Sequence, residues 1–143
     1  NYKCSVKLFM EKIFSKIQKN KLLHIISKKL PEGIKRLDLT DNEKPLQVSR
    51  INLKNIIIKP HSNNSKSLNL GLVEQNECWI VLNGKIDITL FDTDKTKIEN
   101  RTLHKSEILI TCGGGHSINN TSEDAEMIEV KLGPFENNNL TYY

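Results

Sequence analysis

The stretch ECWIVLNGKIDITLFD, from Glu77 to Asp92, contains two strand-like runs that meet at Asn83-Gly84. The first run is apolar from Cys78 to Leu82, and the second alternates apolar and polar residues, with Ile86, Ile88 and Leu90 as its apolar members. Alternation with a period of two is typical of β-strands, and Asn-Gly between two such runs predicts a tight hairpin. The stretch therefore predicts a fold built from β-strands.

Short strands are also predicted on both sides of this stretch, over residues 46–53, 55–59, 98–103, 108–111, 116–119 and 126–131. Many short strands at close spacing, with little helix among them, indicate a β-sandwich or barrel. The whole chain has 143 residues, which suits one domain with a real core.

The N-terminal segment, residues 1–36, differs in charge and pattern from the rest. It holds ten Lys or Arg residues and two Glu, a net of +8, whereas the remainder carries −4. Apolar residues recur at helical spacing, at Val6, Met10, Ile13 and Ile17. We therefore expect a basic amphipathic helical arm. Such a helix can lie on a membrane or bind nucleic acid, but we favour an arm that packs on the domain or on a second subunit, because amphipathic helices are more often simply packed.

These patterns predict three regions: a helical arm (1–36), a β-barrel domain (37–135) and a loosely held polar tail (136–143). Lysines interrupt the early apolar residues, which argues against a signal peptide. The three cysteines form no CxxC pair, which favours free thiols in a reducing compartment. We therefore expect a cytoplasmic protein with no transmembrane segment and no nucleic-acid partner.

The residues best suited to chemistry are Glu77, His61 and His116. By the period of two, Glu77 shares a strand face with Trp79 and Val81, so it becomes a buried carboxylate if that face is interior. His116 follows three consecutive glycines in ITCGGGHSINN, residues 110–120. The glycines allow a sharp bend close to a bound ligand. A plain β-bulge beside a structural histidine is the alternative.

The chain resembles the cupin family over roughly residues 36–135. Glu77 and Gly84 match the end of the first cupin motif, and Gly113, His116 and Asn120 match the second motif. Lys105 and Thr111 depart from that motif. The stretches RLDLTDNEKPLQVSRINL, IIIKPH, ECWIVLNGKIDITLFD, ILITCGGGHSINN and EVKLGPF resemble small bacterial single-domain cupins that are encoded among surface-polysaccharide genes.

This resemblance implies a double-stranded β-helix, the cupin jelly roll, with a ligand pocket in its mouth. It also implies a divalent metal (zinc, iron or nickel) held by His61, Glu77 and His116. Asn63 stands where the family commonly has a second histidine, so a metal-free pocket is the alternative outcome. We expect Asn63, Trp79, Gly114 and Asn120 to contact the ligand.

Two functions follow from the resemblance. One is an enzyme that epimerises or isomerises a saccharide or sugar nucleotide, with His61 and His116 as catalytic residues. The other is a non-catalytic module that binds a small, sugar-derived ligand. Cupins of this size are usually dimers, and the apolar face of the N-terminal arm needs covering, so we also expect a homodimer.

Overall fold

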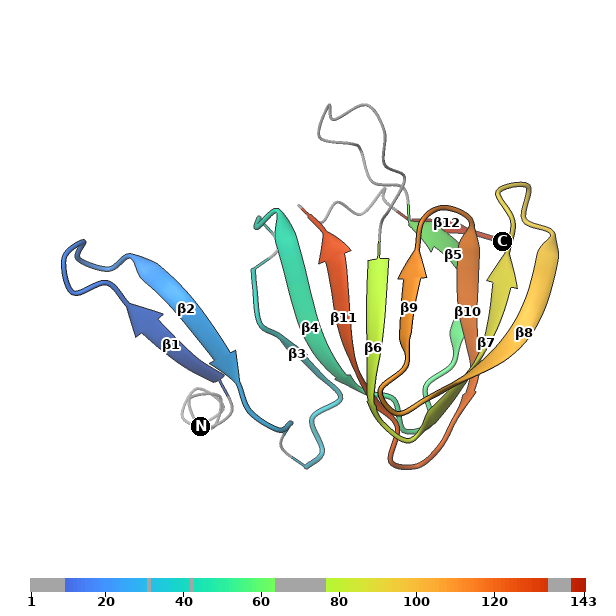
Figure 1. The fold of residues 1–143 in the computed structure, drawn as a ribbon, viewed down its shortest axis with the longest axis horizontal. Coiled ribbons are helices and arrows are strands. Elements are labelled where there is room, and N and C mark those ends of the chain that lie inside the picture. The colour runs from blue at the N-terminus through green and yellow to red at the C-terminus, as the bar shows by residue number, and fades with distance from the viewer. Residues whose placement is uncertain (1–9, 31, 42, 64–76, 134–139) are drawn as a thin grey trace.

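The computed structural model describes residues 10–30, 32–41, 43–63, 77–133 and 140–143, and every regular element within them is a β-strand. Two five-stranded antiparallel sheets form a barrel (Figure 1). The first sheet has the order β12-β5-β10-β7-β8 and consists of Leu140–Tyr142, Ile58–Asn63, Gly115–Thr121, Lys85–Phe91 and Lys97–His104. The second has the order β3-β4-β11-β6-β9 and consists of Arg36–Asp38, Leu46–Asn52, Glu126–Leu132, Glu77–Asn83 and Ile108–Thr111.

The predicted strands of the barrel are confirmed, with boundaries that move by a few residues. The prediction over 108–111 coincides with β9, and that over 126–131 is β11 less one residue. The largest shift is at β5, which begins at Ile58. The described residues include no helix that could cross a membrane.

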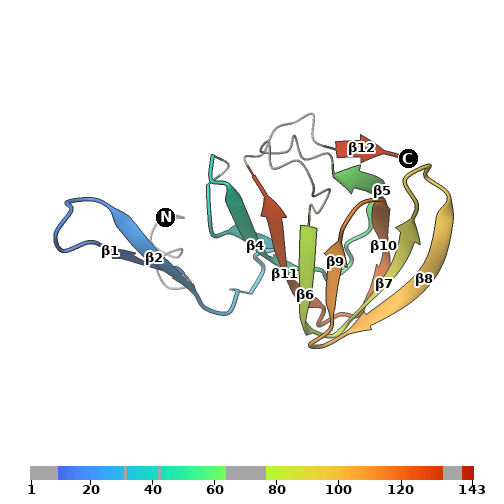
Figure 2. The ribbon, with the colours of Figure 1, turned by 45° about the horizontal axis from the view of Figure 1, so that its top comes forward.

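The predicted hairpin at Asn83-Gly84 is wrong, because β6 and β7 belong to different sheets. Gly84 does take a positive φ, 69°. However, a Cβ there would lie 2.8 Å from the Ala125 backbone and closer still to the Ser122 side chain. The chain therefore uses Gly84 to cross between the two sheets where they approach each other, at the lower end of the barrel in Figures 1 and 2.

The predicted N-terminal helix is also wrong for the part of residues 1–36 that the structure describes. Met10–Phe14 (β1) and Leu22–Ser27 (β2) pair as an antiparallel hairpin that stands beside the barrel (Figures 1 and 2). Asn20 takes a φ of 65° in the connecting turn, and Ser15 Oγ accepts a hydrogen bond from Gln18 N at 2.8 Å. The run of apolar and β-branched residues at 22–26 fits a strand better than a helix, because branched side chains lose freedom in a helical turn. Val6 lies outside the described residues.

The core fills the space between the sheets toward the end where the chain crosses over. Its fully or nearly fully buried members are Ile51, Leu53, Trp79, Val81, Ile86, Ile88, Ile118, Ala125 and Met127. Each barrel strand that contributes to this core also continues to the opposite end of the barrel. There the inward positions of β6 and β10 are polar, at Glu77 and His116.

Of the polar tail predicted over 136–143, the structure describes only residues 140–143, and three of these form a strand, β12. Leu140–Tyr142 pairs with β5, and Tyr142 lies directly opposite His61. The tail sequence is polar and lacks a period-two pattern, so its pairing depends on the exposed edge of β5, which the sequence does not reveal.

Candidate metal and ligand site

Three predicted residues from three strands meet at the polar end of the barrel. His116 on β10 lies opposite His61 on β5, and their ring centroids are 4.7 Å apart. Nε2 of His116 lies 3.0 Å from Oε2 of Glu77, the first residue of β6. One potential ligand atom from each residue lies within 4.8 Å of the others, and all three residues are buried. The structure therefore brings the three predicted residues His61, Glu77 and His116, which we call the trio, into one small space.

Trp79 holds Glu77 from the next inward position of β6. The predicted shared face of Glu77, Trp79 and Val81 is confirmed, since all three side chains are buried. Trp79 Nε1 donates a hydrogen bond of 2.6 Å to Oε1 of Glu77, which leaves Oε2 directed at His116. The indole ring also packs against the His116 ring, with centroids 4.5 Å apart. Trp79 therefore fixes both partners.

The glycine run before His116 makes the turn between β9 and β10. Gly113 and Gly114 have φ values of 132° and 70°, which side chains rarely tolerate. A Cβ on Gly114 would also collide with the carbonyl oxygen of Phe91. The turn delivers His116 to the interior, where a 3.2 Å hydrogen bond joins its Nδ1 to the Thr111 hydroxyl. The turn thus leaves Nε2 as the ring nitrogen that approaches Glu77.

Within the trio, the Glu77 carboxylate is charged and the His61 imidazole is neutral. Burial by itself would raise the pKa of Glu77, but contact with His116 and the charge of Lys131 outweigh it and hold this pKa at about 2. Burial lowers the pKa of His61 below its ordinary value. Nδ1 of His61 donates to the Lys59 carbonyl at 2.9 Å. Since a neutral ring carries one proton, Nε2 of His61 keeps a lone pair.

This donor set fits a divalent metal. Nε2 of His116 is buried and has no correctly oriented hydrogen-bond partner among the described residues, although Glu77 is close. A buried nitrogen without a partner costs free energy, and a metal ion would satisfy it. Supporting contacts orient the other two donors: the Lys59 carbonyl for His61 and the Trp79 indole for Glu77. Such outer contacts are typical of metal ligands.

The other predicted ligand-contacting residues are placed differently. Asn63 ends β5, but its side chain lies outside what the structure describes. Gly114 lies in the turn that positions His116 and contacts the backbone of Phe91. Asn120 is exposed near the far end of β10, beyond a bulge, and its Nδ2 donates to Asp87 at 3.3 Å. The structure therefore does not bring Asn120 to the trio.

Sequence reasoning missed four residues near the trio: Arg36, Glu129, Lys131 and Tyr142. Lys131 lies opposite Glu77, and Glu129 lies opposite Trp79, so both face the interior. Tyr142 contributes a ring whose centroid is 6.0 Å from that of His61. Strand β11 alternates Glu129 and Lys131 with Ile128 and Val130. Periodicity alone assigns the isoleucine and valine to the interior, whereas here they face outward.

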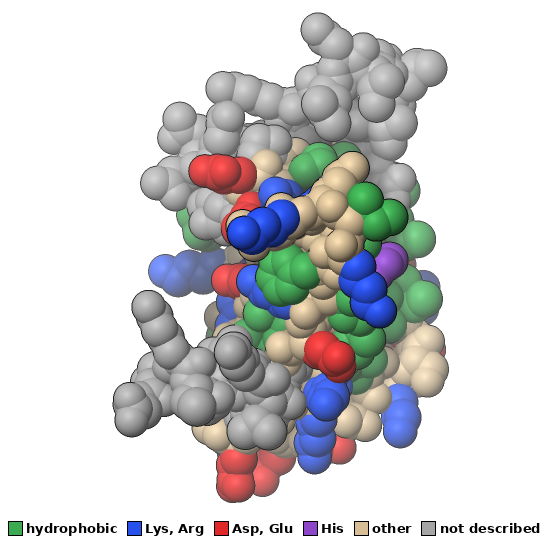
Figure 3. Space-filling view, turned by 90° about the vertical axis from the view of Figure 1, so that its left-hand side faces the viewer, with side chains coloured by type: hydrophobic (Ala, Val, Ile, Leu, Met, Phe, Trp, Pro, Cys, Tyr) green, Lys and Arg blue, Asp and Glu red, His purple; other side chains and the backbone are tan. Residues whose placement is uncertain are grey.

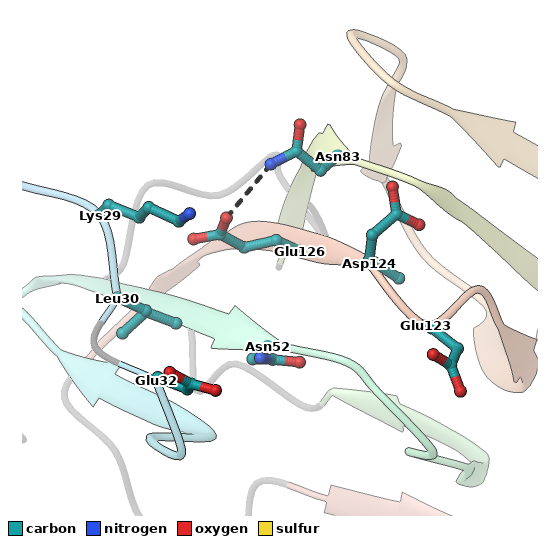
Figure 4. Close-up of a pocket in the computed structure, with 9 residues that line it drawn as sticks. Lys29, Leu30, Glu32, Asn52, Asn83, Glu123, Asp124 and Glu126 are labelled. Carbon is teal, nitrogen blue, oxygen red and sulfur yellow. Dashed lines mark hydrogen bonds between the residues drawn. The ribbon is translucent and has the colours of Figure 1, made fainter.

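A pocket lies at the end of the barrel opposite the trio (Figure 4). It has a volume of about 570 Å³ and several acidic side chains, with Glu126 as its most buried carboxylate. Glu126 is already paired, at 2.5 Å with Arg50 Nε and at 3.5 Å with Asn83 Nδ2. Because its buried charge is satisfied within the chain, this pocket lacks the unmet bonding capacity of the trio.

No family model matches the sequence, and a comparison with curated proteins finds no match. Solved structures do match the fold. A variant of oxalate decarboxylase from B. subtilis is 20% identical, with a TM-score of 0.52, and the match covers 69% of this chain and 24% of that one. KdgF from Halomonas sp. is 15% identical, with a TM-score of 0.51, and 76% and 87% of the two chains are covered. Procruciferin, an 11S globulin of Brassica napus, is 14% identical, with a TM-score of 0.51, over 68% and 23%.

These identities bear on the fold and not on activity, and this chain spans only about a quarter of the oxalate decarboxylase chain. The neighbours are cupin-fold proteins. Together with the two facing sheets and the inward His61, Glu77 and His116, the likeness shows that this chain has the cupin fold.

Proposed function

We propose that this protein is a small cupin that binds a divalent metal through His61, Glu77 and His116 and holds a saccharide-derived ligand in the barrel mouth. The observation that carries the proposal is the buried Nε2 of His116, which has no oriented hydrogen-bond partner in the described part of the chain and lies 3.0 Å from a carboxylate oxygen. A bound metal would act as a Lewis acid on a ligand oxygen. A neighbour in fold, oxalate decarboxylase, has Mn(II) centres, so manganese joins zinc, iron and nickel as a metal to test.

Elemental analysis of protein purified without chelator or affinity nickel tests the metal. We expect about one equivalent per chain and its loss in His116→Ala, because two ligands hold a metal far more weakly than three. His104→Ala is the matched control, since His104 is exposed at the end of β8. Metal that survives His116→Ala unchanged would place it elsewhere. A protein that takes up none of the four metals in excess would refute the metal site.

The second candidate function is epimerisation or isomerisation in a metal-free site, with His61 and His116 as catalytic residues. It is favoured by the lowered pKa of His61, because a neutral imidazole can accept a proton next to a carbonyl. A sugar nucleotide from surface-polysaccharide synthesis is the substrate class to assay first. Turnover in chelator-treated protein that is abolished by His61→Gln would favour this function over the metal-dependent one. A non-catalytic module would bind ligand without turnover in either state.

We also propose that the protein is a homodimer in which the β1–β2 hairpin packs on a second copy. The hairpin forms a sheet of its own, and an isolated two-stranded sheet is marginally stable in water. It exposes Phe14 and Leu23 at 51% and 49%, and Figure 3 shows apolar side chains among Lys and Arg on this side. A second copy offers an apolar surface in turn, since the outer face of β9 exposes Ile108 and Ile110.

Light scattering on the full chain tests the dimer. We expect a dimeric mass that falls to a monomeric mass in the double variant Phe14→Lys, Leu23→Lys, because two charges would be buried without partners. Ile57→Lys is the control, since Ile57 is 74% exposed and lies outside the hairpin. A monomeric mass for the unaltered chain at high concentration contradicts the proposal.

A further inference from the structure

Beside the trio, the inner face of the second sheet carries two cations and two further carboxylates. Lys131 is paired in register with Glu77, and Glu129 is paired with Trp79 on one side and Ser49 on the other. Arg36 and Asp38 lie beside them on β3. We call Lys131, Glu129, Arg36 and Asp38 together the charged row. The charged row and the trio are therefore parts of one surface inside the barrel mouth.

The two cations converge on one oxygen of Glu129. Arg36 Nη2 donates to Oε1 of Glu129 at 3.0 Å, and Lys131 Nζ lies 3.1 Å from the same atom. Asp38 completes the row: its Oδ1 accepts from Arg36 Nε at 2.7 Å and from the Ser49 hydroxyl at 2.6 Å. Glu129 thus holds the Lys131 ammonium and the Arg36 guanidinium together at one point of the row.

Exposure shows which members of the row can meet a ligand. The side chain of Glu129 is 6% exposed, whereas those of Lys131 and Arg36 are 20% and 44% exposed. An ammonium carries three N–H donors, and among the described residues Lys131 makes one ion pair, with Glu129. Both cations are therefore open in part to solvent and to an incoming acceptor, whereas the Glu129 carboxylate that joins them is buried.

Charge balance specifies the kind of acceptor. Arg36 and Lys131 contribute +2, and Asp38, Glu77 and Glu129 contribute −3, so the row and the trio together carry −1 when all are ionised. A divalent metal on the trio would change this to +1. Buried charges are stable only when paired, so the metal-loaded mouth favours a ligand with one negative charge.

We propose that Lys131 and Arg36 bind the carboxylate of a small acidic ligand, of the class of sugar acids, while another oxygen of that ligand reaches the metal held by His61, Glu77 and His116. This inference rests on the proposed metal site and narrows its ligand from saccharides in general to acidic ones. A carboxylate can accept from an ammonium and a guanidinium together and supplies one charge, whereas a phosphate group supplies about two at neutral pH.

Binding of matched sugars to the Mn²⁺-loaded protein tests this subsite. Manganese uptake is measured first, by titration, in each variant. D-galacturonate, D-galactose and D-galactose 6-phosphate are then compared by the relaxation that bound Mn²⁺ causes in their protons, because they differ only at C6. We expect galacturonate to bind about tenfold or more tightly than galactose, the gain typical of a charged hydrogen bond. It should also bind more tightly than the phosphate.

Lys131→Met should remove most of this preference and leave the manganese stoichiometry unchanged, and Lys131→Arg should restore the preference. Lys54→Met is the control, because Lys54 is 51% exposed and paired with Glu123 away from the trio. If Lys131→Met does not fold, the preference for galacturonate is measured in Arg36→Met, which should lose it, and in Lys131→Arg, which should keep it.

Two results would overturn the subsite alone: equal binding of galacturonate and galactose to manganese-loaded protein, or a preference for galacturonate that survives both Lys131→Met and Arg36→Met. Failure of the proposed function looks different. In that case the unaltered protein takes up no manganese in the first step and none of the other three metals in the elemental analysis, and the charge argument for an acidic ligand fails with the metal site.

Discussion

Replacing Glu77 by glutamine should change how the stability of the metal-free protein depends on acid. In the folded protein the pKa of Glu77 is about 2, against an ordinary value of 4.5. A lowered folded pKa means that ionised Glu77 stabilises the fold above pH 4.5 and that this contribution disappears as the pH falls toward 2. The full difference corresponds to about 3 kcal/mol, of which about 2 kcal/mol is lost by pH 3.

The measurement is urea denaturation of chelator-treated protein at pH 7, 5, 4 and 3, for the unaltered chain and for Glu77→Gln. The free energy of unfolding should fall more steeply with acid in the unaltered chain, so that the gap between the two proteins shrinks by about 2 kcal/mol between pH 7 and pH 3. Glu99→Gln is the matched control, since Glu99 is 42% exposed beside Arg101. If the gap stays constant across this range, the ionised, buried state that we assign to Glu77 is wrong.

Two further predictions concern the fold around the site. Gly114→Ala should destabilise the protein by about 3 kcal/mol or more, because Gly114 has a positive φ and a Cβ there would also collide with the Phe91 carbonyl. The control is Gly33→Ala. Gly33 has a φ of 80° but open space around it, so this change should cost only about 1 kcal/mol. Equal losses in urea denaturation would show that the Phe91 contact is unimportant. Arg50→Met should lower the free energy of unfolding by about 3 kcal/mol, because it removes the cation that pairs with the buried Glu126. Lys54→Met removes one partner of an exposed ion pair and should cost less than about 1 kcal/mol. Similar melting temperatures for these two variants would contradict the role of the Arg50–Glu126 pair.

The sequence was sufficient to predict the barrel because its strands carry local signals. The run after Glu77 and the alternation through Ile86, Ile88 and Leu90 each identify a strand without reference to the rest of the chain. Because these signals are local, they also gave the wrong hairpin at Asn83-Gly84. A positive φ at Gly84 is compatible with a hairpin and with a crossing between sheets, and only the distant partners of β6 and β7 distinguish them.

The N-terminal segment shows the limit of periodicity. Met10, Ile13 and Ile17 are spaced as on a helix, yet they lie in a strand and its turn. Ile17 is 94% exposed, so its place in the helical pattern reflects no buried face. Short apolar runs fit both periods, and the pairing of β1 with β2 decides between them.

Of the site, the trio could be predicted and its charged surroundings could not. His61, Glu77 and His116 were identified by the resemblance to cupins and, for Glu77 and His116, by unusual neighbours in the sequence. Lys131 and Arg36 have no such signal, because one follows an ordinary strand pattern and the other ends a basic segment. Their place beside Glu77 exists only once β3, β4, β11 and β6 are aligned in one sheet.

The division of each strand into an apolar and a polar part has an energetic consequence. On β6 the inward face runs from Glu77 through Trp79 to Val81, and on β11 it runs from Lys131 through Glu129 to Met127. The apolar parts supply the burial that stabilises the barrel, while the polar parts hold carboxylates whose desolvation opposes folding. Burial raises the pKa of Glu129, and so do the neighbouring Glu77 charge and a hydrogen bond between the two carboxyl groups. The mouth is thus a costly arrangement that a cation on the trio would relieve, which is the behaviour expected of a site formed to bind a ligand and not to hold the fold together.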